Sequence, residues 1–361
     1  MIIALDRIAV RAQDRARLEE RLRDDYLPGA ARRGLVFVDA WISPPFDLVE
    51  EPVTLFVRWR VADVPAWWAM RSAAGDPAVT AFWASIEPIV VSRERRYLVE
   101  EALGAGAPGG PARAPEASWP APIATAPYEV RMHGWRETVQ VHLPKTASAA
   151  EVKAVETCLA EAGPALPGIE GAWVAANLVA DYGAGHLTWD LRFPDRTTAT
   201  AARASTTWRE RIAPMLERSC ASWTALGLET VGAGLARPGL KEGIKRTALF
   251  RALPGIEPAR LDRWERDLLE MPAHVPAIVN WRLSRAIPLD WSKSAVPAWT
   301  HVWEQEYEQL EGLTVDYMVH PHHWAHVDRW FDPESGSQII DTALCHAFSP
   351  MAGAVLTGDA R

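Results

Sequence analysis

Four of the chain's ten histidines lie within seven residues of one stretch, VDYMVHPHHWAHVDRW, residues 315–330. They are His320, His322, His323 and His326. An unperturbed imidazole titrates at about pH 6.5, so it can take up a proton or bind a transition metal at neutral pH. The stretch is therefore the first candidate for a chemical site.

One interpretation is a metal site. Pro321 suits the first turn of a helix, where its missing N–H costs nothing. On that helix His322 and His326 share a face, and His320 or Asp328 would supply a third ligand. No acidic residue lies between the two histidines as in an HExxH motif, and a bare HxxxH is a weak signal. Solvated or core imidazoles are the more frequent outcome, so we expect no metal and no cofactor.

A second interpretation is a general base. Tyr317 precedes His323 by one to two helical turns and can donate a hydrogen bond to it or to a substrate oxygen. A strand expected over residues 300–307 adds to this picture, because its alternation brings several aromatic residues to one face. Those residues are Trp299, His301, Trp303 and Tyr307. Such a face borders either a ligand or an ordinary aromatic core, and the sequence leaves both open.

Two segments rich in Ala, Gly and Pro, 102–127 and 231–243, interrupt the chain. Such a composition buries too little apolar area to order itself, so both segments are expected to be linkers. They leave three blocks of similar length, 1–101, 128–230 and 244–350.

Each block repeats one order of elements. An alternating strand, a charged amphipathic helix, two further strands, a second helix and a last strand follow one another. The second strand carries a tryptophan each time, Trp41, Trp173 and Trp281. This is the ferredoxin-like order, a four-stranded antiparallel sheet with both helices on one face. The predicted fold class is α+β, with three tandem ferredoxin-like domains of the dimeric α/β-barrel type.

The bare face of each such sheet needs a cover, and two sheets packed face to face would close a barrel. We expect the first two blocks to cover each other. The third block would then pair with the third block of a second chain in a twofold homodimer.

The third block resembles the stress-responsive dimeric α/β-barrel family, which includes plant polyketide cyclases of the olivetolic acid type. The resemblance rests on YMVHPHH, residues 317–323, as a YxxHPxH motif, and on THV, residues 300–302. It covers about residues 244–350, whereas the first two blocks match only in the order of their elements. It implies a sheet-to-sheet barrel that abstracts a proton next to a carbonyl and then forms a C–C bond.

The resemblance also implies roles for individual residues. The second histidine of the motif acts as the base and the tyrosine assists it, which assigns these roles to His323 and Tyr317. The third-strand histidine that lines the family's pocket corresponds to His301. The chain departs from the pattern on the first strand, where Arg246 and Thr247 stand in place of a pocket-facing histidine.

Composition excludes several other functions. A net charge of −8 without a basic stripe argues against nucleic acid. No apolar run approaches the roughly 18 residues that span a bilayer, and the first residues do not form a signal region, so no membrane partner is expected. The three scattered cysteines, Cys158, Cys220 and Cys345, fit a reducing, cytoplasmic location. Phosphate-binding glycine loops, dinucleotide fingerprints and GxSxG are absent from the sequence.

The functional hypothesis is a cofactor-independent lyase, cyclase or isomerase that acts on an aromatic or polyketide-like carbonyl compound. His323 would be the base and Tyr317 its partner or oxyanion donor. Substrate-binding residues would be His301, Trp299, Trp303 and His320, and the chain's 18 tryptophans would supply apolar walls. The alternatives are a non-catalytic, stress-related ligand-binding barrel and a histidine-ligated metal enzyme.

Overall fold

The computed structural model describes residues 1–48, 50–99, 134–294 and 296–356, and the expected linker 102–127 lies outside them. The chain divides into two compact units. The first unit comprises residues 1–119 and 321–342, and the second, here the barrel unit, comprises 120–320 and 343–361. Each unit is described by itself.

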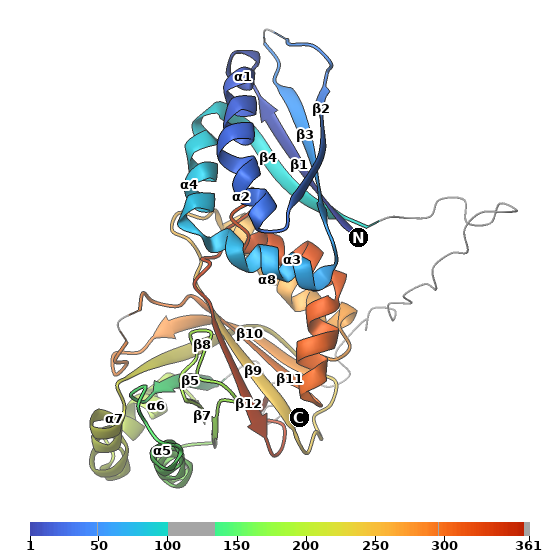
Figure 1. Cartoon of the computed structure of the whole chain (residues 1–361). Coiled ribbons are helices and arrows are strands. Elements are labelled where there is room, and N and C mark those ends of the chain that lie inside the picture. Colours follow the sequence, from blue (N-terminus) through green and yellow to red (C-terminus); the bar gives the residue numbers. More distant parts are fainter. Residues whose placement is uncertain (49, 100–133, 295, 357–361) are drawn as a thin grey trace, which may run out of the picture. The chain divides into compact units, whose positions relative to one another are not determined.

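The first unit is built on the four-stranded antiparallel sheet of the first block (Figure 1). Its strands are β1 (Ile2–Val10), β2 (Val36–Ser43), β3 (Val53–Val61) and β4 (Val90–Leu98), in the order β2-β3-β1-β4. Its helices are α1 (Ala12–Arg21), the π-helical turn η1 (Leu22–Tyr26), α2 (Leu27–Arg32), α3 (Val64–Ser72) and α4 (Pro77–Ile86). This is the predicted ferredoxin-like arrangement.

Alternation along the strands explains which face the helices cover. In β1 and β3 every second residue is buried, and the buried set includes Ile8, Val57 and Trp59. These side chains pack with the helices in one apolar core that also holds Trp67. Trp41 lies on the other face of the sheet, where it is 62% exposed.

Residues 321–342 of the third block complete the first unit. Trp324 lies in the first unit's core, with its ring centroid 5.6 Å from that of Trp67. Further along, the buried carboxylate of Glu334 accepts two hydrogen bonds of 2.9 Å from Arg33 and lies 3.1 Å from Arg95. Arg95 in turn forms a two-pronged ion pair with Asp6 on β1. A chain of alternating charges thus anchors this segment within the first unit.

The barrel unit combines the second and third blocks. The second block supplies β5 (Trp135–His142), α5 (Ala149–Ala162), β6 (Gly171–Ala176), β7 (Leu187–Phe193), α6 (Arg196–Arg203), the π-helical turn η5 (Trp208–Ile212), α7 (Ala213–Ser219) and β8 (Ser222–Leu235). The third block supplies β9 (Gly243–Phe250), α8 (Pro258–His274), β10 (Asn280–Pro288), β11 (His301–Tyr307), the π-helical turn η6 (Gly312–Tyr317) and β12 (Cys345–Met351). Trp173 and Trp281 lie in second strands, as expected.

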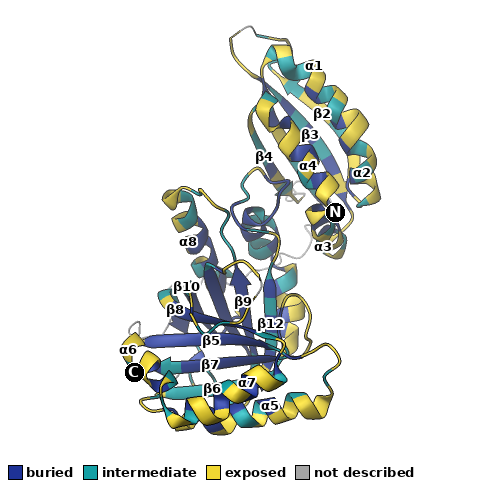
Figure 2. Cartoon of the chain, turned by 90° about the vertical axis from the view of Figure 1, so that its left-hand side faces the viewer, coloured by how far each residue is buried: buried dark blue, intermediate teal, exposed yellow. Residues whose placement is uncertain are grey.

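All eight strands form one sheet, in the order β12-β9-β11-β10-β8-β5-β7-β6. Each half has the ferredoxin-like order, and the halves join where β10 pairs with β8. Two backbone hydrogen bonds link the far ends, from Leu178 N to Phe348 O at 2.7 Å and from His346 N to Tyr182 O at 2.9 Å. The sheet therefore curls into a barrel within a single chain, with helices α5 and α7 on the outside (Figure 2).

This pairing corrects the expected one. The first two blocks do not share a sheet; the second and third blocks do, so the inner face of the third block is already covered inside the chain. The physical reason is β8, which is 14 residues long and pairs with β5 at one end and β10 at the other. It extends to Leu235, so part of the expected linker 231–243 is strand.

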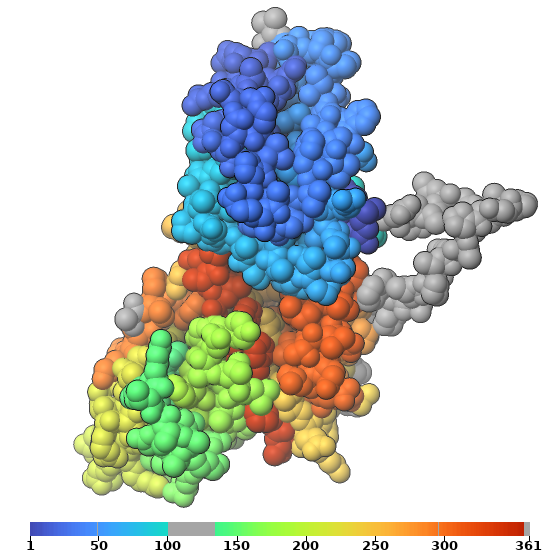
Figure 3. All heavy atoms as spheres, viewed as in Figure 1, coloured from blue at the N-terminus to red at the C-terminus, as the bar shows by residue number. Residues whose placement is uncertain are grey.

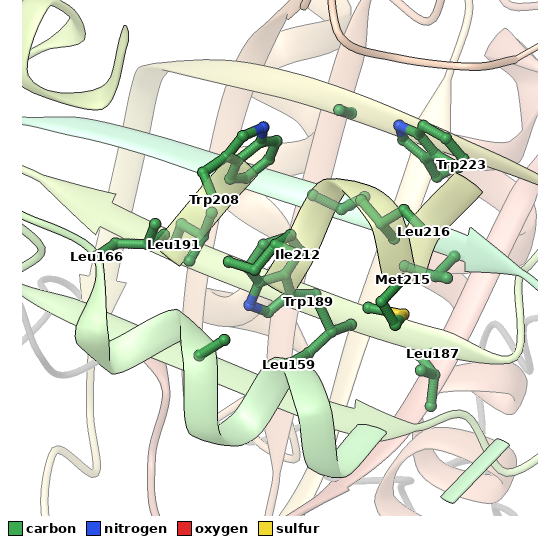
Figure 4. Close-up of a cluster of buried hydrophobic side chains, with 14 of the residues drawn as sticks. Leu159, Leu166, Leu187, Trp189, Leu191, Trp208, Ile212, Met215, Leu216 and Trp223 are labelled. Atoms are coloured by element: carbon green, nitrogen blue, oxygen red, sulfur yellow. The ribbon is translucent and has the colours of Figure 1, made fainter. Parts of the chain in front are cut away.

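One part of the barrel interior is polar. Lys245 on β9 lies 2.9 Å from Asp190 and 3.0 Å from Glu304 on β11, and Arg136 on β5 binds Glu304 from the other side. All four side chains are buried. Buried charges persist only when they are paired, so this network joins the two halves of the barrel. Another part of the interior is apolar and includes Leu249 and Val302. The second block has a further apolar core between the sheet and the helices, where Trp189, Trp208 and Ile212 pack (Figure 4).

Candidate functional site

The histidine-rich stretch is divided between the two units. Tyr317 and His320 belong to the barrel unit, whereas His322, His323 and His326 belong to the first unit. Each part is therefore considered with its own surroundings.

Tyr317 is the last residue of η6, and its side chain is buried against the sheet. Its hydroxyl accepts a hydrogen bond of 3.2 Å from Nη1 of Arg246, whose guanidinium lies 5.1 Å from the centroid of the same ring. Arg246 stands on β9, where the resembling family often has a histidine. A cation held against a phenol makes its O–H a better hydrogen-bond donor.

Arg246 also binds its two neighbouring strands. Its Nη1 donates to Oε1 of Gln305 on β11 at 2.5 Å, and its Nη2 lies 2.8 Å from Nδ1 of His346 on β12. We call these four residues, Arg246, Gln305, Tyr317 and His346, the Arg246 cluster. Three adjacent strands and η6 thus converge on one buried guanidinium.

Three buried donors lie along the same face of β11. In the part of the chain that the structure describes, Nε1 of Trp303, Nε2 of Gln305 and the hydroxyl of Tyr307 have no hydrogen-bond partner. Burial raises the pKa of Tyr307 well above its usual value, so the hydroxyl keeps its proton. Buried polar groups almost always have partners, so three open donors indicate an acceptor such as a ligand oxygen or a water.

His301 lies on the same face but is held by other residues. Its Nε2 lies 3.1 Å from Oε1 of Glu265 on α8, and its Nδ1 lies 2.9 Å from Oγ1 of Thr300. Arg285 donates two hydrogen bonds, of 2.8 and 2.9 Å, to the carboxylate of Glu265. Burial lowers the pKa of His301, although Glu265 opposes that shift. Both ring nitrogens therefore have partners in the protein.

The other predicted binding residues have different surroundings. Trp303 is fully buried on the helix-facing side of β11. Trp299 precedes the strand and packs with Leu249 and Val302, which face the barrel interior, so the expected shared face with His301 is wrong for this residue. Residue 299 precedes β11, which begins at His301, so the alternation of that strand does not extend to it. His320 is buried, and burial, aided by His274, lowers its pKa to about 4.

In the first unit, His323 is partly exposed on the turn His322–Val327, with its ring centroid 5.0 Å from that of Trp68. His322 and His326 share a helix face as predicted, with ring centroids 5.0 Å apart. The third ligand considered for them, Asp328, is instead hydrogen-bonded to Nε of Arg71.

Sequence reasoning missed most of the Arg246 cluster. Arg246 was noted only as a departure from the family pattern, and neither Gln305 nor His346 was singled out. The alternation of β11 carried a usable signal, because Gln305 falls on the same face as His301, Trp303 and Tyr307.

Together, the closed sheet and the buried polar cluster define an α+β barrel built from two ferredoxin-like halves. Residues 244–343 match the stress responsive A/B barrel domain, which confirms the resemblance predicted for the C-terminal third. No curated protein matches the sequence.

Several solved structures resemble parts of this chain at low sequence identity. An anthrone oxidase-like protein is 9% identical and covers 61% of this chain and 91% of its own, with a TM-score of 0.44. A NIPSNAP domain protein from Burkholderia xenovorans is 20% identical over 28% of this chain and 97% of its own, with a TM-score of 0.24. A ferredoxin-like protein from Thermobifida fusca is 17% identical over 28% of this chain and 95% of its own, with a TM-score of 0.25.

Among the described residues, the helices are too short or too polar to cross a membrane.

Proposed function

We propose that the third block binds an aromatic or polyketide-like carbonyl compound and catalyses proton transfer next to its carbonyl group without a cofactor. The observation that carries this proposal is the buried phenol of Tyr317, which is bound by Arg246 and lies on a sheet face with unpartnered donors at Gln305 and Tyr307. Such donors suit an oxygen that gains negative charge during a reaction.

The proposed reaction needs only a base and an oxyanion donor. A base takes the proton from the carbon next to the carbonyl, a role that the resemblance to the family proposes for His323, and the electron pair moves onto the carbonyl oxygen. The O–H of Tyr317 stabilises that enolate oxygen. The enolate carbon then adds to a second carbonyl, whose oxygen takes the proton back from the imidazolium; the reverse sequence cleaves the bond. No electrons are gained or lost, so the class is an aldol-type or retro-aldol-type lyase, cyclase or isomerase.

Binding roles are also proposed for four further residues, each on a different observation: Trp303, His320, His301 and Trp299. Trp303 lies beside the Arg246 cluster on β11 and supplies an apolar wall with a donor at its edge. His320 is proposed to act as a neutral imidazole, because its pKa of about 4 leaves it uncharged at pH 7. His301, whose two nitrogens are engaged, is proposed to position the wall of the site rather than touch the reacting atoms. Trp299 is proposed only as a second apolar contact.

The experiment uses NMR to measure how fast the protons next to the carbonyl of an aryl ketone exchange with deuterium in D2O. Exchange requires removal of such a proton by the base, and this step is common to both directions of the reaction. Titration calorimetry with the same ketone measures binding. In His323→Ala, exchange is expected to fall by about a hundredfold or more while binding is kept. Undiminished exchange removes His323 as the base, and binding by the wild type without any exchange identifies a ligand-binding barrel instead.

A homodimer stays a prediction, as does the cytoplasmic location. The dimer would have to use a surface other than the inner face of the third block, because the second block covers that face. Sedimentation velocity of the full chain measures it.

A further inference from the structure

A separate apolar groove lies in the first unit, between the α1–η1 helix and the edge strand β2. These elements lie on the face of the first unit that is turned to the viewer in Figure 3. The volume of the groove is about 460 Å³, within the range of small-molecule sites. The residues that matter to its shape are Leu22, Leu27, Phe37, Ala40, Ile42 and Trp59.

A β-bulge in the edge strand shapes this groove. Phe37 pairs with Trp59 and Ala40 pairs with Val57, although an even spacing would put Phe37 and Ala40 on opposite faces. The extra residue lies between Phe37 and Asp39, and it keeps both side chains on the helix-facing side. The helices cover this side of β2 only in part, since Phe37 is 44% exposed.

Trp59 forms the floor of the groove, and Leu22 lies on the wall opposite β2. The ring of Phe37 meets that of Trp59 edge to face, with centroids 5.8 Å apart. The indole N–H of Trp59 is donated to Asp6 at 2.7 Å, so the floor presents carbon and no free donor. Across the groove, Leu22 begins the π-helical turn η1, a local widening that is common at functional sites.

The charged residues at the rim are already paired. Glu19 accepts from Arg15 at 2.8 Å, and Arg23 donates to Asp24 at 3.0 Å. Neither charge needs a counter-ion from a ligand, so the groove selects for shape and apolar contact. Aromatic ligands gain additional edge-to-face contacts with Phe37 and Trp59.

We propose that this groove binds a compact, uncharged aromatic molecule, as a second small-molecule site in the first block. This proposal rests on residues of the first unit alone. It is independent of the chemistry proposed for the third block.

The test uses the full chain and the uncharged fluorophore N-phenyl-1-naphthylamine, whose emission rises in apolar surroundings. Two variants are compared with the wild type. Ala40→Trp fills the groove from an exposed position on the edge strand. Trp41→Ala is the matched control, because it removes the most exposed aromatic side chain from the opposite face of the same strand. Far-ultraviolet circular dichroism and thermal melts verify that both variants are folded.

The proposal expects saturable binding of one fluorophore at the groove, at least tenfold weaker in Ala40→Trp and within twofold of the wild type in Trp41→Ala. No saturable binding, equal binding in Ala40→Trp, or loss of binding in Trp41→Ala would overturn it. A chain that lacks residues 102–127 should bind the fluorophore equally well. Markedly tighter binding by that chain would show that its own Ala- and Pro-rich segment is the natural occupant, and would also overturn the proposal.

Discussion

The guanidinium of Arg246 both stacks over the ring of Tyr317, 5.1 Å from its centroid, and donates a 3.2 Å hydrogen bond to its hydroxyl. A phenol that is buried and bound in this way is held in one orientation. In the proposed reaction Tyr317 is the oxyanion donor, and this relationship assigns Arg246 the role of a positioning residue.

Replacing this positioning residue tests that role. Arg246→Gln removes the charge and the contacts to Tyr317 and His346, so the exchange rate per folded molecule is expected to fall about tenfold to a hundredfold. The fall should appear in the rate at saturating ketone more than in the affinity. Arg218→Gln, at an exposed position of the same unit, is the control and should leave both unchanged. An Arg246→Gln variant with the wild-type rate at saturation would contradict the assignment.

Glu334 is expected to dominate the stability of the first unit. Its carboxylate binds Arg33 and Arg95 in a buried site, and Glu334→Gln would leave two buried guanidinium groups short of a partner. We expect a loss of about 3–5 kcal/mol in the free energy of unfolding of the first unit. Urea denaturation measures it. The matched control is Glu87→Gln, because Glu87 is 68% exposed and 3.5 Å from Arg93; there the loss should be below about 0.5 kcal/mol. Similar small losses in both variants would contradict this account of the buried cluster.

The barrel unit should lose stability as the pH falls from about 6.5 toward 4. Burial lowers the pKa of His320 to about 4, and it also lowers the pKa values of His142, His186 and His301. Between these values and the ordinary pKa of about 6.5, the unfolded chain binds more protons than the folded chain, so protonation favours unfolding. Above about pH 6.5 these histidines are neutral in both the folded and the unfolded chain, so their protonation no longer reduces the free energy of unfolding.

Urea unfolding at pH 7.5, 6.0 and 5.0 checks this dependence. The contribution of His320 is on the order of 1–3 kcal/mol across the window. In His320→Gln the decline between pH 7.5 and 5.0 should be shallower than in the wild type. A decline of equal slope in both proteins would show that His320 does not titrate in this way.

Local sequence patterns predicted the elements well. The alternating run IIALDRIAV became β1 over Ile2–Val10, and AAEVKAVETCLAEA became α5 over Ala149–Ala162. In both cases the signal lies in neighbouring residues: a period of two for the strand, and a period near 3.6 with a Ser148–Glu151 capping box for the helix.

Long-range pairing could not be read in the same way. Arg71 is 8% exposed and bonded to Asp328, which lies 257 residues away in the chain, and no local pattern indicates that partner. The partner of each sheet was also predicted wrongly, because three similar blocks can be paired in several ways and no local pattern distinguishes them. For the same reason, the sequence identified Tyr317 as a candidate and yet did not reveal that Arg246 binds it.

The most direct test of the central claim is the deuterium exchange rate of an aryl ketone in Tyr317→Phe, with Tyr182→Phe as the control. Tyr182 is 61% exposed in the same unit, so its variant should match the wild type. Loss of the oxyanion donor is expected to slow exchange by about a hundredfold or more in Tyr317→Phe, with binding of the ketone little changed. Exchange by Tyr317→Phe at the wild-type rate would contradict the claim that this buried phenol stabilises the enolate.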